Sequence, residues 1–210
     1  MTIGIQGKLA KYARKVKTSS SNKVVSPEDV LLKAGIVYEE VYLHDLSVGM
    51  FTRFNRHQEV NWCWRKKDGK WVLQNIPFVI EWSYADIVSL VDCLKDTIRS
   101  GGIVLGAFSG EFIVGFASVE NDPFGSDLEY IQLSNLHVSY EHRGKGIGKA
   151  LFKLTCKAAK SMNAKKLYIS AHSSEETQAF CKSIKCREAA FYHARLAMAR
   201  PYDRQLEYTL

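Results

Sequence analysis

The segment His142–Phe152, HRGKGIGKALF, decides how the rest of the sequence is interpreted. Its first eight positions hold three glycines and the basic residues Arg143, Lys145 and Lys149, and it then becomes apolar and helix-forming. Glycine lets the backbone come close to an anion and turn successive N–H groups toward it. A helix start adds free N–H donors and the positive end of its dipole. The segment therefore predicts an anion-binding turn, and a phosphate loop, a dinucleotide fold and a basic surface turn must be distinguished.

Two common nucleotide-binding motifs do not fit this spacing. A dinucleotide fold needs G-x-G-x-x-G, but the third glycine, Gly148, comes one position early. The acid expected after the next strand is also missing, since that strand ends in SAH at residues 170–172. A P-loop needs Ser or Thr after Gly-Lys to hold magnesium, and Ala150 stands there. The motif that fits is R-x-x-G-x-G, which lies between an expected strand and an expected helix. A loop of this kind can bind a diphosphate. A basic turn without a ligand is the alternative.

The segment Leu136–Phe152, LHVSYEHRGKGIGKALF, resembles the central motif of the GNAT N-acetyltransferase superfamily, whose Q/R-x-x-G-x-G/A loop binds the pyrophosphate of acetyl-CoA. The resemblance continues through Tyr168–Phe180, which is similar to the family's fifth strand and following helix, and it covers roughly residues 36–210. The segments 54–71 and 205–210 also resemble an uncharacterised bacterial subgroup of the superfamily. The resemblance implies an α/β (α+β) fold with a mixed, mostly antiparallel central sheet flanked by helices, in which the fourth and fifth strands splay apart.

Hydrophobic spacing and turn residues predict the individual elements. Strands are predicted at 36–43, 103–108, 111–119, 128–138, 166–171 and 205–210, with a hairpin at 62–74 around Asp68-Gly69. Helices are predicted at 26–35, 48–58, 83–99, 149–162, 174–184 and 188–200. No internal repeat or second domain is evident, so residues 26–210 are expected to form one acetyltransferase domain.

Positive charge is concentrated at the N-terminus. Residues 1–25 contain six basic side chains and no acidic one, which accounts for most of the net charge of +7. They are predicted to form a basic arm whose apolar residues recur at helical spacing. A targeting segment, a contact with an acidic surface and a solvated arm all fit this pattern. The remainder of the chain is nearly neutral, which argues against a specific nucleic-acid partner.

The cysteines give no sign of a metal or of disulfides. There are five, and none forms C-x-x-C or a His/Cys spacing suited to zinc. Reduced thiols in a cytoplasmic protein are the simplest interpretation. No apolar run approaches the ~20 residues needed to span a bilayer, and no secretory signal is evident. The sequence thus predicts a cytoplasmic protein without a transmembrane segment and leaves a homodimer open.

The resemblance assigns the binding of acetyl-CoA, the acetyl donor, to residues in and around the motif. It implies that three strand residues hold the pantetheine arm and the thioester carbonyl through their backbone. It implies further that the loop amides hold the pyrophosphate and that a serine at the next helix start contributes. These residues are Leu136, His137, Val138, Arg143, Gly144, Lys145, Gly146, Ile147, Gly148, Lys149 and Ser174.

Acetyl transfer to an amine also requires a base for the amine and an acid for the departing thiolate. Members of the family often use a carboxylate on the third or fourth strand as the base. Glu120, at the end of the expected third strand, is the candidate here. Asp122, Glu129 and His137 are alternatives.

The acid is where the sequence departs from the family pattern. The family helix commonly contains AxxFYxxxGF, and its tyrosine protonates the sulfur of CoA. Here Cys181 occupies the tyrosine position and Lys185 the glycine position. A thiol can donate a proton, because its free pKa is ~8.5, but it is shorter than tyrosine. Cys181 is therefore the candidate acid; Tyr192 or water could replace it, and Cys181 could instead be an ordinary buried residue.

The acceptor is expected to lie over the splayed strands. Aromatic and basic residues expected near that wall are Arg53, Arg56, Trp62, Trp64, Trp82 and Tyr84. Carboxylates at Glu120 and Glu129 would suit a cationic amine. The predicted function is transfer of an acetyl group from acetyl-CoA to a primary amine of a small molecule. A CoA-binding sensor without catalysis and a protein or peptide N-acetyltransferase are the alternatives.

Overall fold

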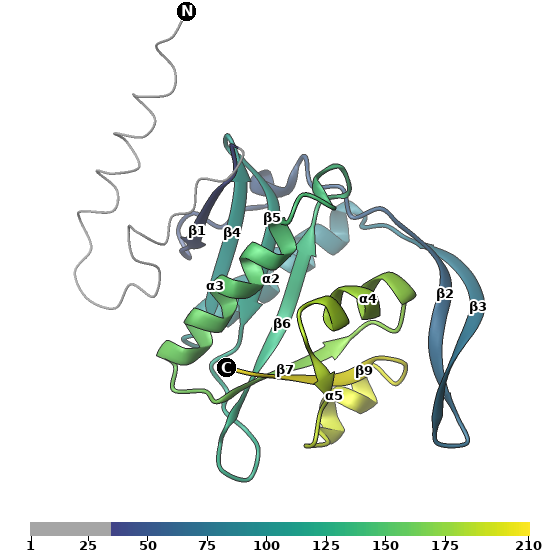
Figure 1. The fold of residues 1–210 in the computed structure, drawn as a ribbon. Helices are drawn as coiled ribbons and strands as arrows, with labels where there is room; N and C mark the ends of the chain where they lie inside the picture. The colour runs from purple at the N-terminus through teal and green to yellow at the C-terminus, as the bar shows by residue number, and fades with distance from the viewer. Residues whose placement is uncertain (1–34) are drawn as a thin grey trace, which may run out of the picture.

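The computed structural model describes residues 35–210. The predicted basic arm at 1–25 and the helix predicted to begin at Ser26 lie outside the described residues. Seven strands form the central sheet in the order β1-β4-β5-β6-β7-β9-β8 (Figure 1). Their bounds are β1 Val37–Val41, β4 Ile103–Ser109, β5 Phe112–Val119, β6 Tyr130–Val138, β7 Lys166–Ala171, β8 Arg187–Glu188 and β9 Arg204–Thr209.

Within residues 35–210, β6 and β7 run parallel and every other pair of neighbours in this sheet is antiparallel. The mostly antiparallel mixed sheet that the family resemblance implied is therefore confirmed. Strands β4 and β5 are joined by a tight turn in which Gly110 has φ +65°. Both strands are buried on their two faces, as expected for an apolar hairpin at the centre of a sheet.

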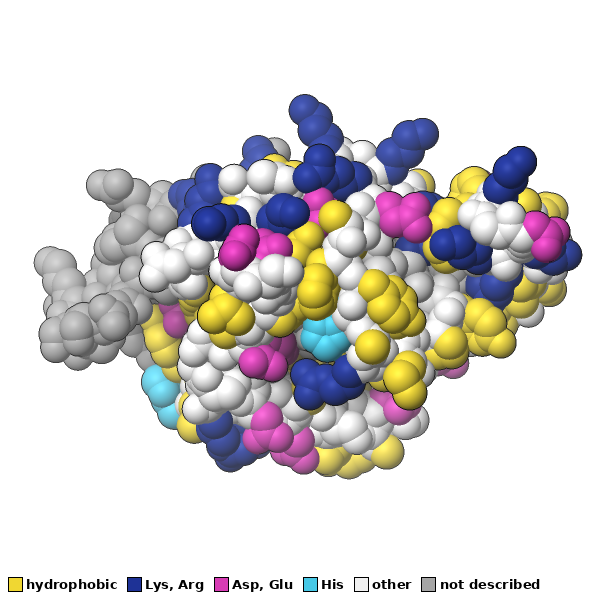
Figure 2. Space-filling model, turned by 90° about the horizontal axis from the view of Figure 1, so that it is seen from below, with side chains coloured by type: hydrophobic (Ala, Val, Ile, Leu, Met, Phe, Trp, Pro, Cys, Tyr) yellow, Lys and Arg dark blue, Asp and Glu magenta, His cyan; other side chains and the backbone are white. Residues whose placement is uncertain are grey.

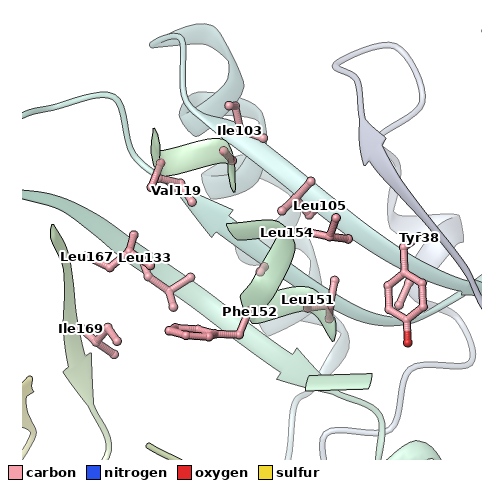
Figure 3. Packing of buried hydrophobic residues seen from close by; sticks show 14 of the residues in the cluster. Tyr38, Ile103, Leu105, Val119, Leu133, Leu151, Phe152, Leu154, Leu167 and Ile169 are labelled. Atoms are coloured by element: carbon pink, nitrogen blue, oxygen red, sulfur yellow. The ribbon is translucent and has the colours of Figure 1, made fainter. Parts of the chain in front are cut away.

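Helices α3 (Ile147–Ser161) and α2 (Tyr84–Arg99) cover opposite faces of the larger part of the sheet. Helix α3 packs its inward leucines against β4, β5 and β6, as Figure 3 shows for Leu151 and Leu154 against Leu105, Val119 and Leu133. Helix α2 covers the opposite face with a second apolar cluster. Fully burying a side chain of this size stabilises the fold by about 1.5–3 kcal/mol.

Helix α2 confirms the predicted helix at 83–99, and local hydrogen bonds explain where it begins. Ser83 accepts from the backbone N–H of Asp86 at 3.2 Å, and the Asp86 carboxylate accepts from the Ser83 N–H at 2.7 Å. This reciprocal cap satisfies N–H groups that the first turn leaves unpaired. The helix ends before Gly101, whose φ of +86° turns the chain into β4.

Strands β6 and β7 separate after a short contact. They pair only through Tyr130↔Lys166, Ile131↔Leu167 and Gln132↔Tyr168. On the other side of β6, the register with β5 shifts so that Ser134 is an extra, bulged residue. The splay of the fourth and fifth family strands is therefore present here between β6 and β7.

A buried carboxylate links the strands near this contact. Glu207 on β9 accepts from Tyr130 on β6 and, at 3.2 Å, from the Ala190 N–H. It also pairs with Lys166 on β7 at 3.5 Å and with Arg187 on β8 at 2.8 Å. Its side chain is 1% exposed. Because removing one partner of a buried charge is costly, this cluster fixes the start of β6 to the C-terminal strands.

The predicted hairpin is present and longer than expected. Strands β2 (Gln58–Lys67) and β3 (Lys70–Ile80) meet at a two-residue turn in which Asp68 and Gly69 have φ +49° and +77°. The hairpin projects to one side of the molecule (Figure 1). It is tied to the C-terminal end of β7 by the Trp64 N–H, which donates to the Ser173 carbonyl at 2.8 Å.

Two helix predictions are wrong, and tertiary contacts explain both. Between 48 and 58 the structure has only a short 3-10 helix, η2 (Val48–Phe51), because Phe51 and Phe54 turn into the cluster around Phe116. The segment 188–200 contains β8, a loop and a short helix α5 (Ala194–Ala199). The backbone of Ala189 pairs with β9 instead of continuing a helix.

Candidate active site

A cavity of about 870 Å³ follows the splay between β6 and β7. Its walls come from the C-terminal halves of both strands, the glycine loop, the start of α4 (Glu175–Ser183), the loop before β2 and the segment after α5. This volume lies within the range of pockets that enclose small ligands and cofactors. Seen from below, the molecule is hollowed near its centre, with a histidine in the hollow and side chains of both charges around it (Figure 2).

The glycine loop presents backbone rather than side chains. Gly144 and Gly146 have φ of +74° and +83°, and a Cβ at either position would meet nothing within 4 Å. Helix α3 begins directly after Gly146 without a side-chain cap, and its first helical bond runs from the Ala150 N–H to the Gly146 carbonyl at 3.1 Å. The N–H groups of residues 147–149 therefore have no acceptor within the helix. A helix start with free N–H groups suits an anion.

Other groups on the loop suit a phosphate ligand. His142 and Lys149 line the cavity, and Nδ1 of His142 is buried without a hydrogen-bond partner in the described part of the chain. Gly148 packs closely, because a Cβ there would lie 3.2 Å from the Phe180 ring. Lys145 is exposed and does not line the cavity. The residues present thus fit the diphosphate that the sequence predicts for this loop.

The Arg143 side chain forms hydrogen bonds that hold the glycine loop against neighbouring segments of the chain. Its Nε donates to the Val138 carbonyl at 3.0 Å, and its Nη2 donates to the Arg56 carbonyl at 3.4 Å. Its guanidinium also lies 5.5 Å from the centre of the Tyr140 ring. These contacts join the end of β6 to the loop before β2.

The strand residues predicted to hold the pantetheine arm lie along the cavity on β6. Leu136 and Val138 pack against the core on the α3 side. The His137 ring lies on the α2 side, 5.0 Å from the Trp82 ring and 5.4 Å from the Phe116 ring. Burial and three nearby arginine charges lower the pKa of His137 to about 3. The ring is therefore neutral at physiological pH and too weakly basic to deprotonate an ammonium group.

Glu120 does not line the cavity but lies one hydrogen bond behind it. Its carboxylate accepts from Ser134 Oγ and, at 3.0 Å, from Thr97 Oγ1 on α2. Ser134, the bulged residue of β6, does line the cavity. Asp122 is exposed and 3.7 Å from Arg195. Among the candidate carboxylates, Glu120 is thus the one connected to the cavity, through Ser134.

The Glu129 carboxylate is turned toward its own loop, where it accepts from the Asp127 N–H at 3.0 Å. Neither Glu129 nor Glu120 is in the lining, so the structure does not present the acidic pair that was expected to face a cationic amine.

Cys181 lines the cavity from α4 and is 5% exposed. Its sulfur accepts a hydrogen bond from the Cys186 thiol, which lowers the pKa of Cys181 and raises that of Cys186. Tyr192 is 68% exposed in the loop before α5 and is not part of the lining. Of the two predicted proton donors, only Cys181 is therefore at the cavity.

Ser174 is buried and caps α4 by accepting from the Thr177 N–H at 3.4 Å. Its Oγ also accepts from Gln58 Nε2 at 3.4 Å. It does not line the cavity, whereas Thr177 does. Its position in the structure is that of a helix cap and an anchor for β2.

Of the residues expected near the acceptor, Arg56 lines the cavity and Trp82 lies behind His137. Arg53 instead stacks over Phe112 at 3.9 Å, and Tyr84 is 75% exposed. The sequence interpretation missed Ser134, His172 and Arg200. A serine within the predicted strand was the available signal for Ser134. Arg200 was missed because residues 188–200 were predicted to be one helix.

Residues 35–210 contain no cluster of His, Cys, Asp and Glu side chains that could hold a metal ion. No helix in this part of the chain has the length and apolar character needed to cross a membrane.

Residues 38–183 match the model of the acetyltransferase (GNAT) family. A putative streptothricin acetyltransferase from Bacillus anthracis, solved with acetyl coenzyme A, has a similar fold, with 15% identity and a TM-score of 0.58 over 83% of this chain and 96% of that one. Nourseothricin acetyltransferase gives 15% identity and a TM-score of 0.56 over the same shares.

An integron cassette protein from the mobile metagenome of V. cholerae is 25% identical, with a TM-score of 0.51 over 77% of this chain and 93% of that one. No curated protein sequence matches the chain. The family match spans more than half of the chain and agrees with the splayed sheet and the glycine loop. The chain therefore belongs to the GNAT family of acetyltransferases, enzymes that take the acetyl group from acetyl-CoA.

Proposed function

We propose that this acetyltransferase transfers the acetyl group to a primary amine of a small molecule, by direct attack of the amine. The observation that carries the proposal is that one cavity joins the glycine loop to Ser134, which is hydrogen-bonded to Glu120. The names of two similar proteins, a streptothricin and a nourseothricin acetyltransferase, also support a small-molecule acceptor. The cytoplasmic location predicted from the cysteines belongs to the proposal; all five thiols are free.

The protein groups have separate tasks in this proposal. The amides of residues 147–149 and the side chains of His142 and Lys149 hold the diphosphate, and the β6 backbone orients the pantetheine arm. Bound acetyl-CoA supplies a thioester carbonyl, which the amine nitrogen attacks. As the C–N bond forms and the C–S bond breaks, the amine loses a proton to Glu120 by way of Ser134 Oγ. The Cys181 thiol donates its proton to the departing CoA sulfur, and exchange with water then reprotonates Cys181 and deprotonates Glu120.

The first test is calorimetric titration with acetyl-CoA, followed by a thiol-release screen over amino acids, polyamines, aminoglycosides and peptides. Gly146→Glu places a carboxylate in the anion site and should weaken acetyl-CoA binding by about 100-fold or more, because several charge-assisted hydrogen bonds are lost. Gly110→Glu is the matched control, since Gly110 also has a positive φ and open space around it but lies in the β4–β5 turn.

Equal binding by both glycine variants would remove the glycine loop from the site. Binding of acetyl-CoA without thiol release on any amine would favour the CoA-binding sensor instead of an enzyme. Release with peptides alone would favour a protein N-acetyltransferase.

A further inference from the structure

Three arginines line the cavity near His137, and within residues 35–210 only Arg200 among them is paired with a carboxylate. Arg56, Arg143 and Arg200 all lower the pKa of His137 through their charges. Arg200 lies 4.0 Å from Asp203, and Arg143 is bonded to backbone carbonyls. Within residues 35–210, Arg56 forms no ion pair with a carboxylate. Arg143 also lacks a carboxylate but donates to two carbonyl groups, whereas the buried Nε of Arg56 has no acceptor, so Arg56 is the less satisfied of the two charges.

The Arg56 side chain is half-buried and only partly satisfied. Its Nη1 donates to Gln58 Oε1 at 2.9 Å, and the guanidinium lies 5.7 Å from the centre of the Trp82 ring. Its Nε is buried and has no hydrogen-bond partner in the described chain. Burial, and then the charge of Arg143, lower the pKa of Arg56 to about 10, so it remains protonated at neutral pH. A guanidinium held in this way is costly unless an anion completes it.

The rest of this wall repels a simple cation. The two histidines that line it, His137 and His172, are kept neutral, since burial and then the charge of Arg56 lower the pKa of each. The carboxylates in the lining are Glu59 and Glu176, both of which are exposed side chains, and Glu59 lies 3.5 Å from His57. The charges that act on the His137 ring are those of the three arginines, so the potential at this wall is positive. A polyamine would meet repulsion here, whereas a molecule with its own negative group would be attracted.

The free edge of the Arg56 guanidinium indicates which class of ligand this residue can bind. Nε is buried and Nη1 donates only one of its two hydrogens to Gln58, so the outer edge formed by Nη1 and Nη2 is the part of Arg56 that is left for a ligand. Arginine binds carboxylates side by side along such an edge, with two parallel hydrogen bonds. We infer that the acceptor is an amine that also carries a carboxylate, bound by Arg56 with support from Arg200, while its amine faces Ser134. This inference rests on the proposed function and names its substrate class as amino-acid-like.

The test compares acceptors that differ only in the anionic group. Thiol release is measured for α-amino acids, their carboxamides, the corresponding decarboxylated amines and the aminophosphonates. We expect the carboxylates to exceed the amides and amines in kcat/KM by about 10- to 100-fold, the range for one lost charge-assisted interaction. Equal use of acids and amides, or preference for polyamines, would overturn the inference. Preference for phosphonates would replace the carboxylate assignment.

Variants of Arg56 show whether the preference for carboxylate-bearing acceptors arises at this residue. Arg56→Gln should raise KM for the amino acid by about 10- to 100-fold while leaving KM for acetyl-CoA unchanged, and Arg56→Lys should recover only part of this loss. Arg99→Gln, at the exposed end of α2, is the control for loss of one surface arginine. A rise in KM for acetyl-CoA alone would assign Arg56 to the CoA side and overturn the inference.

Failure of the inference and failure of the proposed function give different results. If acetyl-CoA does not bind, the function fails before any acceptor is tested. If acetyl-CoA binds but no acceptor is turned over, titration of the same amino acids into the CoA complex still shows whether Arg56 binds a carboxylate-bearing amine. Absence of binding by carboxylate-bearing amines, or binding unchanged by Arg56→Gln, would then reject the inference.

Discussion

The two sides of the cavity are built in different ways. On the α3 side, the contacts come from the backbone of one continuous segment, the glycine loop and the first turn of α3. On the α2 side, they come from side chains on separate elements, including Arg56 before β2, Ser134 on β6 and Arg200 after α5. A binding site made of backbone groups depends on the positions of glycines in the sequence and on the residue at which a helix begins. A side-chain site depends on which distant segments the fold brings together, and three variants test this contrast.

The largest effect is expected on the α2 side, at the pair formed by Glu120 and Ser134. Glu120→Gln removes the proton acceptor and should lower kcat by about 10²- to 10⁴-fold, the usual contribution of general base catalysis. Acetyl-CoA affinity should stay within about twofold, since Glu120 is remote from the glycine loop. Steady-state kinetics and titration measure the two quantities. Asp122→Asn, on the exposed loop, should leave kcat unchanged; a large loss there with full activity in Glu120→Gln would reverse the assignment.

His137 should make the α2 side sensitive to acid. Its pKa is about 3 in the folded protein and near 6.5 in an unfolded chain, so the unfolded state binds more protons between these values. Stability from this group is therefore complete above pH 6.5 and is lost as pH falls toward 3. Between pH 7 and pH 4 the loss should be about 3 kcal/mol. His137→Phe, which keeps an aromatic ring, should flatten this part of the curve in denaturant titrations.

His57 is a control of opposite sign for the same measurement. The hydrogen bond to Glu81 raises its pKa, so its contribution is present at low pH and is lost as pH rises through the raised value. His57→Gln should therefore not flatten the acid limb. An acid limb that is unchanged in His137→Phe would show that the acid sensitivity arises elsewhere.

The smallest effect is expected at Cys181. A thiol that protonates the leaving group must itself be protonated, so activity falls as pH rises through its pKa. Because the hydrogen bond from Cys186 lowers the pKa of Cys181, the decline should begin at a lower pH than for an unperturbed thiol. Cys181→Ala should lower kcat by about tenfold or less, since water can replace a weak acid, and should remove this decline from the pH–rate profile. A profile unchanged in Cys181→Ala would leave Cys181 as a packing residue.

The same contrast explains what could be predicted from sequence. The glycine loop and its helix were recognisable because every residue that matters lies within one short segment. The splay followed from the family resemblance. Ser134 was not recognised, because a serine within a strand does not by itself reveal the one-residue bulge between β5 and β6. Arg200 was missed because an alanine-rich segment favours helix in isolation, whereas pairing of Ala189 with β9 determines its actual path.

The short ladder between β6 and β7 also divides the sheet into two halves. Beyond three residue pairs, the β7-β9-β8 half is held to the larger half by the Glu207 cluster and by helix packing. Such a boundary is where cooperative opening is expected to begin, and amide hydrogen exchange should be faster in β7 and β9 than in β4 and β5. A molecule that fills the splay contacts both halves and stabilises only the closed form. The concentration of substrate would then determine how fast proteases degrade the protein, as well as how fast the protein catalyses its reaction.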